Sequence, residues 1–422
     1  MPLLCRAIAL AAVAALSLSS NRLQAATSEL QLEALIEEAL ERNPELALLQ
    51  ERLAAERSRI PQAGALQDPR FKVDFSNVPL SGIQLTLSQQ LPYWGKRNAR
   101  ERMAAHTAVA MEASYLDREG VIVNLVKQSY FTLAFLDKAI EITIENEALL
   151  RNFIRITQSK YAVGTGLQQD VLKAQVTLSS LKDGLIGLRR RRGHAEAELN
   201  TVLNQSPQRP LGPVEVRLPS PFVYKTDDLQ RMALERRPAL RQLQAQVAHW
   251  EAAEDLARAD HRPDFDVSIG YRQRSIANDA VAGSDFISVA VAANLPVYAG
   301  RKQDHRSVEM RARRAAAEAE FEVRRQQVFL EIQKLAVDIE AHQEQTALFK
   351  TAIIPQAEQS LKAAIAGYQV DTVDFLTLLN NQVSLQNFEI GYFRHRMAYE
   401  KSLAQVEAIV GTRLFEPRTS QP

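Results

Sequence analysis

Histidine and cysteine are the side chains best suited to metal binding and catalysis, and the sequence holds seven histidines and one cysteine. No two histidines stand at the spacing along the chain that metal sites use, so we interpret each one as a surface or groove residue. No Ser-His-Asp or Cys-His arrangement indicates an enzyme, and no nucleotide-binding signature is present. The sequence therefore predicts no metal site, no cofactor and no catalytic residues. The histidines are His106, His194, His249, His261, His305, His342 and His395.

The charges give no electrostatic reason to expect a nucleic acid partner. The chain carries 51 basic and 50 acidic side chains, for a formal net charge of +1. The one dense basic run is Arg189–Arg192, in a helical pattern. We interpret this run as a solvated or acid-paired helix face, with nucleic-acid binding as the weaker alternative.

The first 25 residues have the order of a signal peptide. Arg6 precedes the apolar run Ala7–Leu18, and small residues follow around Ala25, where we place the cleavage. The alternative is a cytosolic chain with an apolar first helix. Cys5 lies inside this segment, so we expect a mature chain without cysteine or disulfide.

Beyond residue 25, no stretch reaches the roughly 18 uninterrupted apolar residues of a transmembrane helix. If the mature protein meets a membrane, it must do so from the surface or through β-strands closed into a barrel.

The remaining chain contains one pattern twice. Pro44 and Pro69 recur 194 residues later as Pro238 and Pro263, within similar surroundings. The matches fall at prolines, glycines and aromatic residues between the helices, so they do not merely reflect similar helix composition. The predicted boundaries are a signal peptide at 1–25, a first repeat at 26–204, a linker at 205–225, a second repeat at 226–411 and a tail at 412–422.

Each repeat has the same order of elements. An amphipathic helix (Leu30–Gln62, Thr226–Asp260) precedes two strands with period-2 alternation, such as Phe71, Val73 and Phe75. A long helical hairpin follows. We expect Asp227 or Asp228 to cap the second amphipathic helix, Pro355 to kink or interrupt a long helix, and the linker to hold one short strand, Val214–Leu218. The expected hairpin helices are Lys96–Val163 with Leu167–Asn204, and Arg301–Val370 with Asp374–Val410.

Four short strands cannot close a barrel, and open strand edges in a membrane would leave backbone groups unsatisfied. The chain must therefore oligomerise, and three copies would supply twelve strands, enough to leave an aqueous lumen. The predicted fold is mainly α with a small β-barrel: a trimer with a long coiled-coil helical barrel and a 12-stranded membrane β-barrel, four strands per chain.

Two motifs carry a resemblance to a known family. The run Tyr161-x-x-Gly164-x-x-x-x-x-Asp170-Val171-Leu172-x-Ala174 looks like a hairpin-tip signature, and Ser88–Arg97 looks like a strand-to-helix corner. With the duplicated order of elements, they resemble the TolC family of outer membrane efflux proteins over essentially the whole mature chain. The corner looks more like the heavy-metal-cation (Czc/Cus-like) branch than the multidrug branch.

The resemblance implies a passive homotrimeric duct in the outer membrane lipid, with a long periplasmic extension. It would receive substrates, expected to be metal cations, from an RND-type inner-membrane pump and a periplasmic adaptor (membrane fusion protein). A multidrug or type I secretion duct stays open as an alternative. A periplasmic coiled-coil adaptor is disfavoured, because the hairpin occurs twice, each behind its own strand pair.

The resemblance also assigns candidate functional residues. The two tips would contact the adaptor and form the periplasmic mouth. The acidic motif positions fall on Asp170 in the first repeat but on Thr377 and Asn380 in the second, so we hypothesise that Asp371 and Asp374 supply the charge instead. The alternative is that these acids lie at solvated helix ends, with Asp374 as an N-cap. Trp94 could anchor the corner at the membrane interface or pack in a core. The tip residues are Gly164, Thr165, Gly166, Asp371, Thr372 and Val373; the corner residues are Pro92, Trp94, Gly95, Pro296 and Gly300.

Overall fold

The computed structural model describes residues 30–76, 82–214, 221–274 and 285–415. The predicted signal peptide, Cys5, most of the predicted strand Val214–Leu218 and the end of the C-terminal tail lie outside these residues. Val214 itself forms a single parallel bridge with Leu30.

The chain divides into two compact units, and each draws on both sequence repeats. The sheet unit comprises residues 48–117 and 238–327, and the hairpin unit comprises the described residues of 1–47, 118–237 and 328–422. The boundary between the units therefore does not follow the boundary between the repeats.

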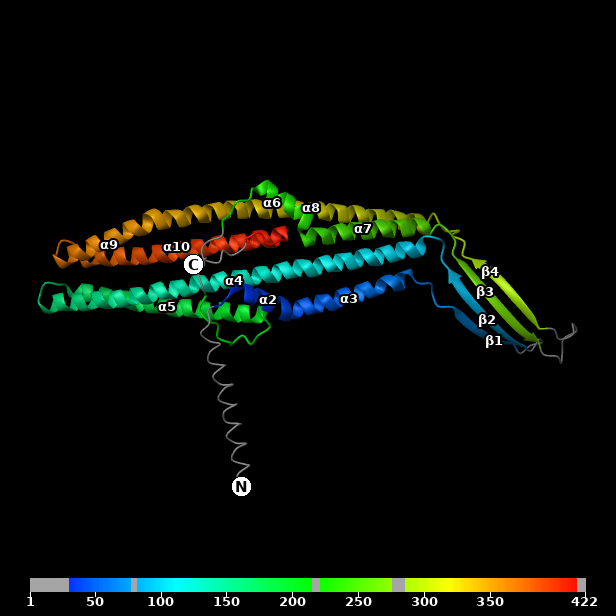
Figure 1. Cartoon of the computed structure of the whole chain (residues 1–422), viewed down its shortest axis with the longest axis horizontal. Helices are drawn as coiled ribbons and strands as arrows, with labels where there is room; N and C mark the ends of the chain where they lie inside the picture. The colour runs from blue at the N-terminus through cyan, green and yellow to red at the C-terminus, as the bar shows by residue number, and fades with distance from the viewer. Residues whose placement is uncertain (1–29, 77–81, 215–220, 275–284, 416–422) are drawn as a thin grey trace, which may run out of the picture. The chain divides into compact units, whose positions relative to one another are not determined.

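The sheet unit is built on four antiparallel strands in the order β1-β2-β3-β4 (Figure 1). The two predicted strand pairs are confirmed, and they join into one sheet because β2 of the first repeat pairs with β3 of the second, with Leu85 opposite Tyr271. Within the described residues, β1 and β4 each pair on one side only. The strands are β1 (Arg70–Ser76), β2 (Gly82–Leu91), β3 (Phe265–Arg274) and β4 (Phe286–Ala293).

Large apolar residues alternate with polar or small ones along the strands, and many of the large apolar side chains are exposed. Phe75 and Ile287 are 77% and 71% exposed, although apolar strand residues of this size are usually buried. An apolar sheet surface of this kind marks a site that meets a partner or a membrane. The other exposed apolar strand residues are Phe71, Val73, Ile83, Leu87, Leu91, Ile269, Tyr271, Phe286, Val289 and Val291.

Helix α7 (Pro238–Ala259) contacts the start of α8 (Gln303–Leu348) through one buried carboxylate. The Glu254 side chain is only 3% exposed, and it accepts hydrogen bonds from Arg258 at 2.5 Å, Arg311 at 3.4 Å and Arg314 at 3.1 Å. Burial alone would raise the pKa of Glu254, but the arginines outweigh it and hold the pKa below its usual value. The ion pairs thus keep a buried charge in place between the two helices.

Proline breaks both amphipathic helices, so the prediction of one continuous helix in each repeat was wrong. The first splits into α2 (Leu32–Arg42) and α3 (Pro44–Gly64), and the second into α6 (Thr226–Arg236) and α7. Asn43 and Arg237 take extended conformations, with ψ of 123° and 118°, because the following proline ring disfavours helical geometry. The predicted N-cap was also wrong: Lys225 holds that position, and Asp227 and Asp228 lie in the first turn.

The hairpin unit contains both turns and most of the two predicted helical hairpins; the first residues of α4 and of α8 belong to the sheet unit. Helix α4 (Lys96–Ala162) turns into α5 (Gln168–Val202), and α9 (Ile354–Gln369) turns into α10 (Phe375–Val410). A five-residue π-helix, η1 (Phe349–Ile353), separates α8 from α9 directly before Pro355, which confirms the predicted interruption. Near the turns, a shared apolar core joins all four helices; it includes Phe153, Ala174, Leu361 and Phe375.

Two buried polar contacts join α4 to α10. Lys127 donates to Glu407, with side chains 11% and 7% exposed, and Glu407 also accepts from the backbone N–H groups of Leu414 and Phe415 at 2.9 Å each. Farther along, the Gln382 amide donates to Asn146. Removing one partner of a buried charged pair leaves the other charge poorly solvated, which costs more than losing an exposed pair.

Lys127→Met should therefore lower the free energy of unfolding by about 3–5 kcal/mol, because Glu407 keeps its charge but loses its cation. Arg151→Met is the matched control on the same helix. It removes an exposed partner of Glu147, whose ion pair lies at 2.6 Å, and should change the free energy of unfolding by less than about 0.5 kcal/mol. Denaturant unfolding of the purified protein measures both, and equal effects would contradict this role for the buried pair.

Candidate functional site at the helical hairpin tips

The first tip, between α4 and α5, is closed by backbone hydrogen bonds to one carbonyl. The N–H groups of Thr165 and Gly166 both donate to the Lys160 carbonyl at 3.0 Å, while Gly164 turns the chain with φ of +78°. A Cβ atom on Gly166 would lie 2.9 Å from the Lys160 Cβ, so the turn requires glycine there. The predicted tip residues Gly164, Thr165 and Gly166 therefore form the turn itself.

The second tip, between α9 and α10, repeats this closure with different residues. The N–H groups of Thr372 and Val373 donate to the Gly367 carbonyl at 2.9 and 3.3 Å, and Asp371 takes φ of +59°. Asp371 thus occupies the left-handed position that Gly164 fills in the first tip; aspartate tolerates this conformation better than most residues. The Asp374 carboxylate caps α10 by accepting the Thr377 N–H at 2.8 Å, as expected for an N-cap.

Lys160 joins the two tips. Its ammonium donates to the Tyr368 carbonyl at 2.7 Å and to the Asp371 carboxylate, and it lies 4.5 Å from the centre of the Tyr368 ring. Because the ammonium offsets the charge of Asp371, the remaining acidic side chains, Asp170 and Asp374, carry most of the local negative charge.

The surroundings of Asp170 and Asp374 shift the pKa values of these two carboxyl groups in opposite directions. Burial, and then the Asp374 carboxylate, raise the pKa of Asp170 above its usual value. Hydrogen bonding to the Thr377 side chain, and then to the Thr377 backbone N–H, holds the pKa of Asp374 below its usual value. Burial, followed by the charges of Asp170 and Asp371, raises the pKa of Tyr368, whose hydroxyl has no hydrogen-bond partner among the described residues.

The second-repeat motif positions, Thr377 and Asn380, add no carboxylate to this acidic group, although the Thr377 N–H donates to Asp374. Thr377 and Asn380 are exposed on the first turns of α10, whereas Asp374 stands at the helix start, close enough to Asp170 to affect its pKa. The proximity of Asp374 to Asp170 is the geometry that the substitution hypothesis requires. Asp371 fits that hypothesis less well, because Lys160 neutralises it.

The predicted strand-to-helix corner depends on a residue that sequence reasoning missed. Gly95 turns the chain with φ of +91°, and Trp94 is 84% exposed, which excludes core packing within the chain. The Lys96 side chain is only 3% exposed and donates to the Arg262 carbonyl at 2.9 Å and to Asp264 at 2.8 Å. In the second corner, the Ala299 N–H donates to the Pro296 carbonyl at 3.1 Å, and Gly300 follows in the turn before α8.

Asp264, directly before β3, is the acceptor that holds the first corner in place. Burial alone would raise the pKa of Asp264, but hydrogen bonds from Lys96 and from the Tyr93 N–H hold it below its usual value. In the sequence, Lys96 is one of the basic residues that end the corner motif, with no sign of a buried contact. Its partners lie more than 160 residues away, so only the folded chain identifies it.

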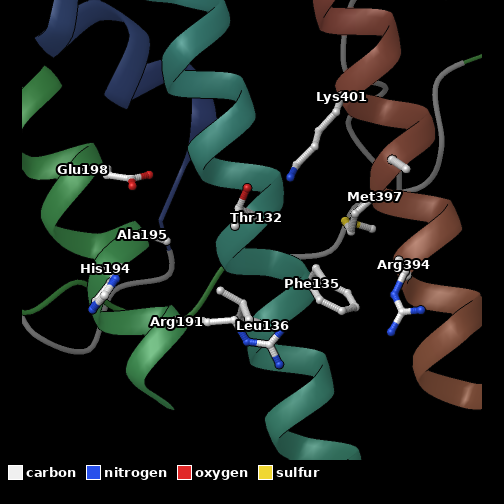
Figure 2. Close-up of a pocket in the computed structure, with 11 residues that line it drawn as sticks. Thr132, Phe135, Leu136, Arg191, His194, Ala195, Glu198, Arg394, Met397 and Lys401 are labelled. Carbon is white, nitrogen blue, oxygen red and sulfur yellow. The ribbon is translucent and has the colours of Figure 1, made fainter. Parts of the chain in front are cut away.

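A groove of about 450 Å³ between α4, α5 and α10 is lined by basic side chains. Figure 2 shows Arg394 and Lys401 on α10 and Arg191, His194 and Glu198 on α5 around it. Burial lowers the pKa of Lys401. This grouping could not be predicted from the sequence, because its residues come from three helices.

The arginine run matches the predicted solvated or acid-paired helix face: Arg189, Arg190 and Arg191 are exposed, and Arg192 is paired with acids. Arg192 contacts Asp137 at 2.5 Å and also Glu196. Burial tends to lower the pKa of Arg192, but the two acids outweigh it and raise the pKa.

The described residues contain neither a helix long and apolar enough to cross a membrane nor a group of three or more His, Cys, Asp or Glu side chains that could hold a metal ion.

Comparison with known proteins identifies relatives along the chain. It is 28% identical to Protein CyaE of Bordetella pertussis over 299 residues, a match that spans 68% of this chain but only 57% of CyaE. It is 22% identical to the cobalt-zinc-cadmium resistance protein CzcC of Cupriavidus metallidurans over 383 residues, spanning 87% of this chain and 86% of CzcC. Its fold is similar to that of CusC, known from crystal structures, with a TM-score of 0.79, 17% identity and coverage of 92% of this chain and 94% of CusC.

The model of the family described as "Outer membrane efflux protein" matches residues 35–205 and 229–412. These two segments cover most of the chain, and they include both hairpins and all four strands. The chain therefore belongs to the outer membrane efflux protein family, as a channel-forming protein of the outer membrane rather than an enzyme.

Proposed function

We propose that the chain forms the outer membrane duct of a tripartite efflux system and that it exports metal cations. The observation that carries the metal assignment is the similarity to CzcC over 87% of this chain, since CzcC is a cobalt-zinc-cadmium resistance protein. The acidic group at the hairpin tips supports it, because unneutralised carboxylates favour cations.

The proposed assembly is a homotrimer. Strands β1 and β4 each have one unpaired edge within the described residues, and unpaired backbone groups are costly in lipid. Three copies would pair these edges into a twelve-stranded barrel whose exposed apolar side chains, such as Phe75 and Ile287, face the membrane. In such a trimer, Asp170 and Asp374 would each form a ring of three charges.

The hairpin tips are the proposed contact with a periplasmic adaptor, which in turn would connect the duct to an RND-type pump in the inner membrane. Apolar side chains at both tips support this assignment: Val163, Leu167 and Val370 are 75%, 66% and 69% exposed. Exposed apolar residues around a tight turn suit a helical partner. The alternative that this chain is itself the adaptor does not fit its family.

The exported substrate can be tested in the native host. Deleting the gene should raise sensitivity to cobalt, zinc and cadmium, and a plasmid copy should restore resistance, because a passive duct is needed to complete export. Sensitivity is read as the minimum inhibitory concentration. A change for drugs alone would reject metal export and favour the multidrug or secretion alternative.

Asp170→Asn and Asp374→Asn should each lower the cation-to-anion permeability ratio about twofold or more, since each removes a ring of charge at the mouth. Reversal potentials of the purified channel in planar lipid bilayers give this ratio. Asp183→Asn, an exposed position farther along α5, is the matched control and should leave it unchanged. Unchanged selectivity in both tip variants would reject the acidic mouth.

The same selectivity should depend on pH in a defined direction. Because the pKa of Asp170 is raised, this carboxyl takes up a proton at a higher pH than an ordinary aspartate does. Cation selectivity of the wild-type channel should therefore fall as the pH decreases through that raised pKa. In Asp170→Asn this first step should disappear, leaving only the fall at lower pH that belongs to Asp374. An identical profile in both proteins would contradict the role of Asp170.

A further inference from the structure

Two histidines that lie 53 positions apart in sequence meet between helices of the hairpin unit. His342 lies near the end of α8 and His395 in the middle of α10. Their Nδ1 atoms are 3.4 Å apart, and their ring centres are 5.6 Å apart. Neither residue belongs to the hairpin tips or to the strand-to-helix corners.

This separation suits two ligands of one metal ion. Imidazole nitrogens bind zinc at about 2.0–2.1 Å in a tetrahedral arrangement, which places two ligand nitrogens about 3.3 Å apart. The observed 3.4 Å therefore needs almost no rearrangement to receive an ion. Without metal, one neutral imidazole can donate its Nδ1–H to the Nδ1 atom of the other at this distance, so the pair does not require an ion.

The surroundings hold His395 in place. The Phe349 ring stacks on the His395 imidazole, with ring centres 5.6 Å apart and planes 26° apart. Phe349 begins the π-helix η1, a local distortion that is frequent at functional sites. Across from it, a Cβ atom on Gly391 would lie 3.2 Å from the Phe349 ring, so the glycine leaves the space that this ring occupies.

The protonation state also suits a ligand. Burial, followed by the nearby His342 and Arg394, lowers the pKa of His395 below its usual value. A lowered pKa favours the uncharged imidazole, which is the form that binds metals. The Gln345 side-chain oxygen lies 3.4 Å from His342 Nδ1 and offers a further polar group beside the pair.

We propose that His342 and His395 bind one divalent transition-metal ion through their Nδ1 atoms, with water completing its coordination. Imidazole ligands favour zinc, copper(II) and nickel over magnesium or calcium. Because the described residues hold no group of three or more His, Cys, Asp or Glu ligands, this is a two-ligand site with open positions, suited to reversible binding. The proposal concerns a site on the protein itself and does not depend on which substrate the duct exports.

Zinc titration of the purified, untagged, full-length protein tests the proposal. Isothermal calorimetry should show one zinc ion per chain, and X-ray absorption at the zinc edge should show two imidazole ligands. The absorption measurement uses the wild-type protein, so it needs no variant to fold. No zinc uptake at about 100 μM, or a bound zinc with fewer than two imidazoles, would overturn the proposal.

Variants assign the binding to these two residues. His342→Ala and His395→Ala should each weaken zinc binding about tenfold or more, because each removes one of only two protein ligands. His305→Ala is the matched control: it removes an exposed histidine on α8 and should leave the affinity unchanged. His342→Gln keeps the size and polarity of the side chain, and it should lose affinity while the melting temperature stays near that of the wild-type protein. Wild-type affinity in the double variant His342→Ala/His395→Ala would reject the site.

Discussion

Within the described residues, β1 and β4 each have one unpaired edge, and the rest of the proposed assembly depends on how these edges are paired. A four-stranded sheet with exposed apolar side chains cannot lie in lipid alone, because its edge N–H and C=O groups have no water to bond there. Copies of the same chain are the partners that can pair both edges in the same register. Symmetry then gives every residue near the axis identical neighbours, so one carboxylate per chain becomes a ring of charge.

Because each charge would recur in every copy of the chain, the ion pair between Lys160 and Asp371 strongly affects the total charge of the proposed mouth. Within the chain, the ammonium of Lys160 cancels the charge of Asp371 and binds the Tyr368 carbonyl, so it joins the two tips and removes one acidic group from the electrostatic sum. Asp170 and Asp374 keep the remaining negative charge, with pKa values shifted in opposite directions. A mouth built from these two groups changes its charge in two separate steps over acidic pH, rather than in one.

The sequence predicted the features that depend on local chemistry. The alternation of apolar and polar residues predicted the four strands, and the glycines predicted the first tip. Asp374 caps α10, as its position before a helical run suggested. The helix breaks before Pro44 and Pro238 could also have been predicted, since the residue before a proline disfavours helix. Continuous helices were predicted instead because the apolar pattern continues on both sides of each proline.

The features that the sequence did not show all depend on contacts between distant segments. Lys96 reaches Asp264 across more than 160 residues, and the basic groove draws on three helices. Histidine spacing along the chain concerns neighbours on one helix, so it could not show that His342 and His395 face each other from different helices. Spacing reports neighbours on one element, whereas these sites form between elements.

Polar pairs along α10 oppose the tendency of long apolar helices to slip along one another. Two such helices can slide past each other by one turn, about 5.4 Å, while still burying much the same apolar area. On α10, Gln382, His395 and Glu407 stand 12 to 13 residues apart, and they contact Asn146, His342 and Lys127 respectively. A slip of one turn would leave all three without their partners and would bury at least one unpaired charge. The alignment of α10 with α4 and α8 is thus determined by a few polar contacts, and one of these contacts is the histidine pair.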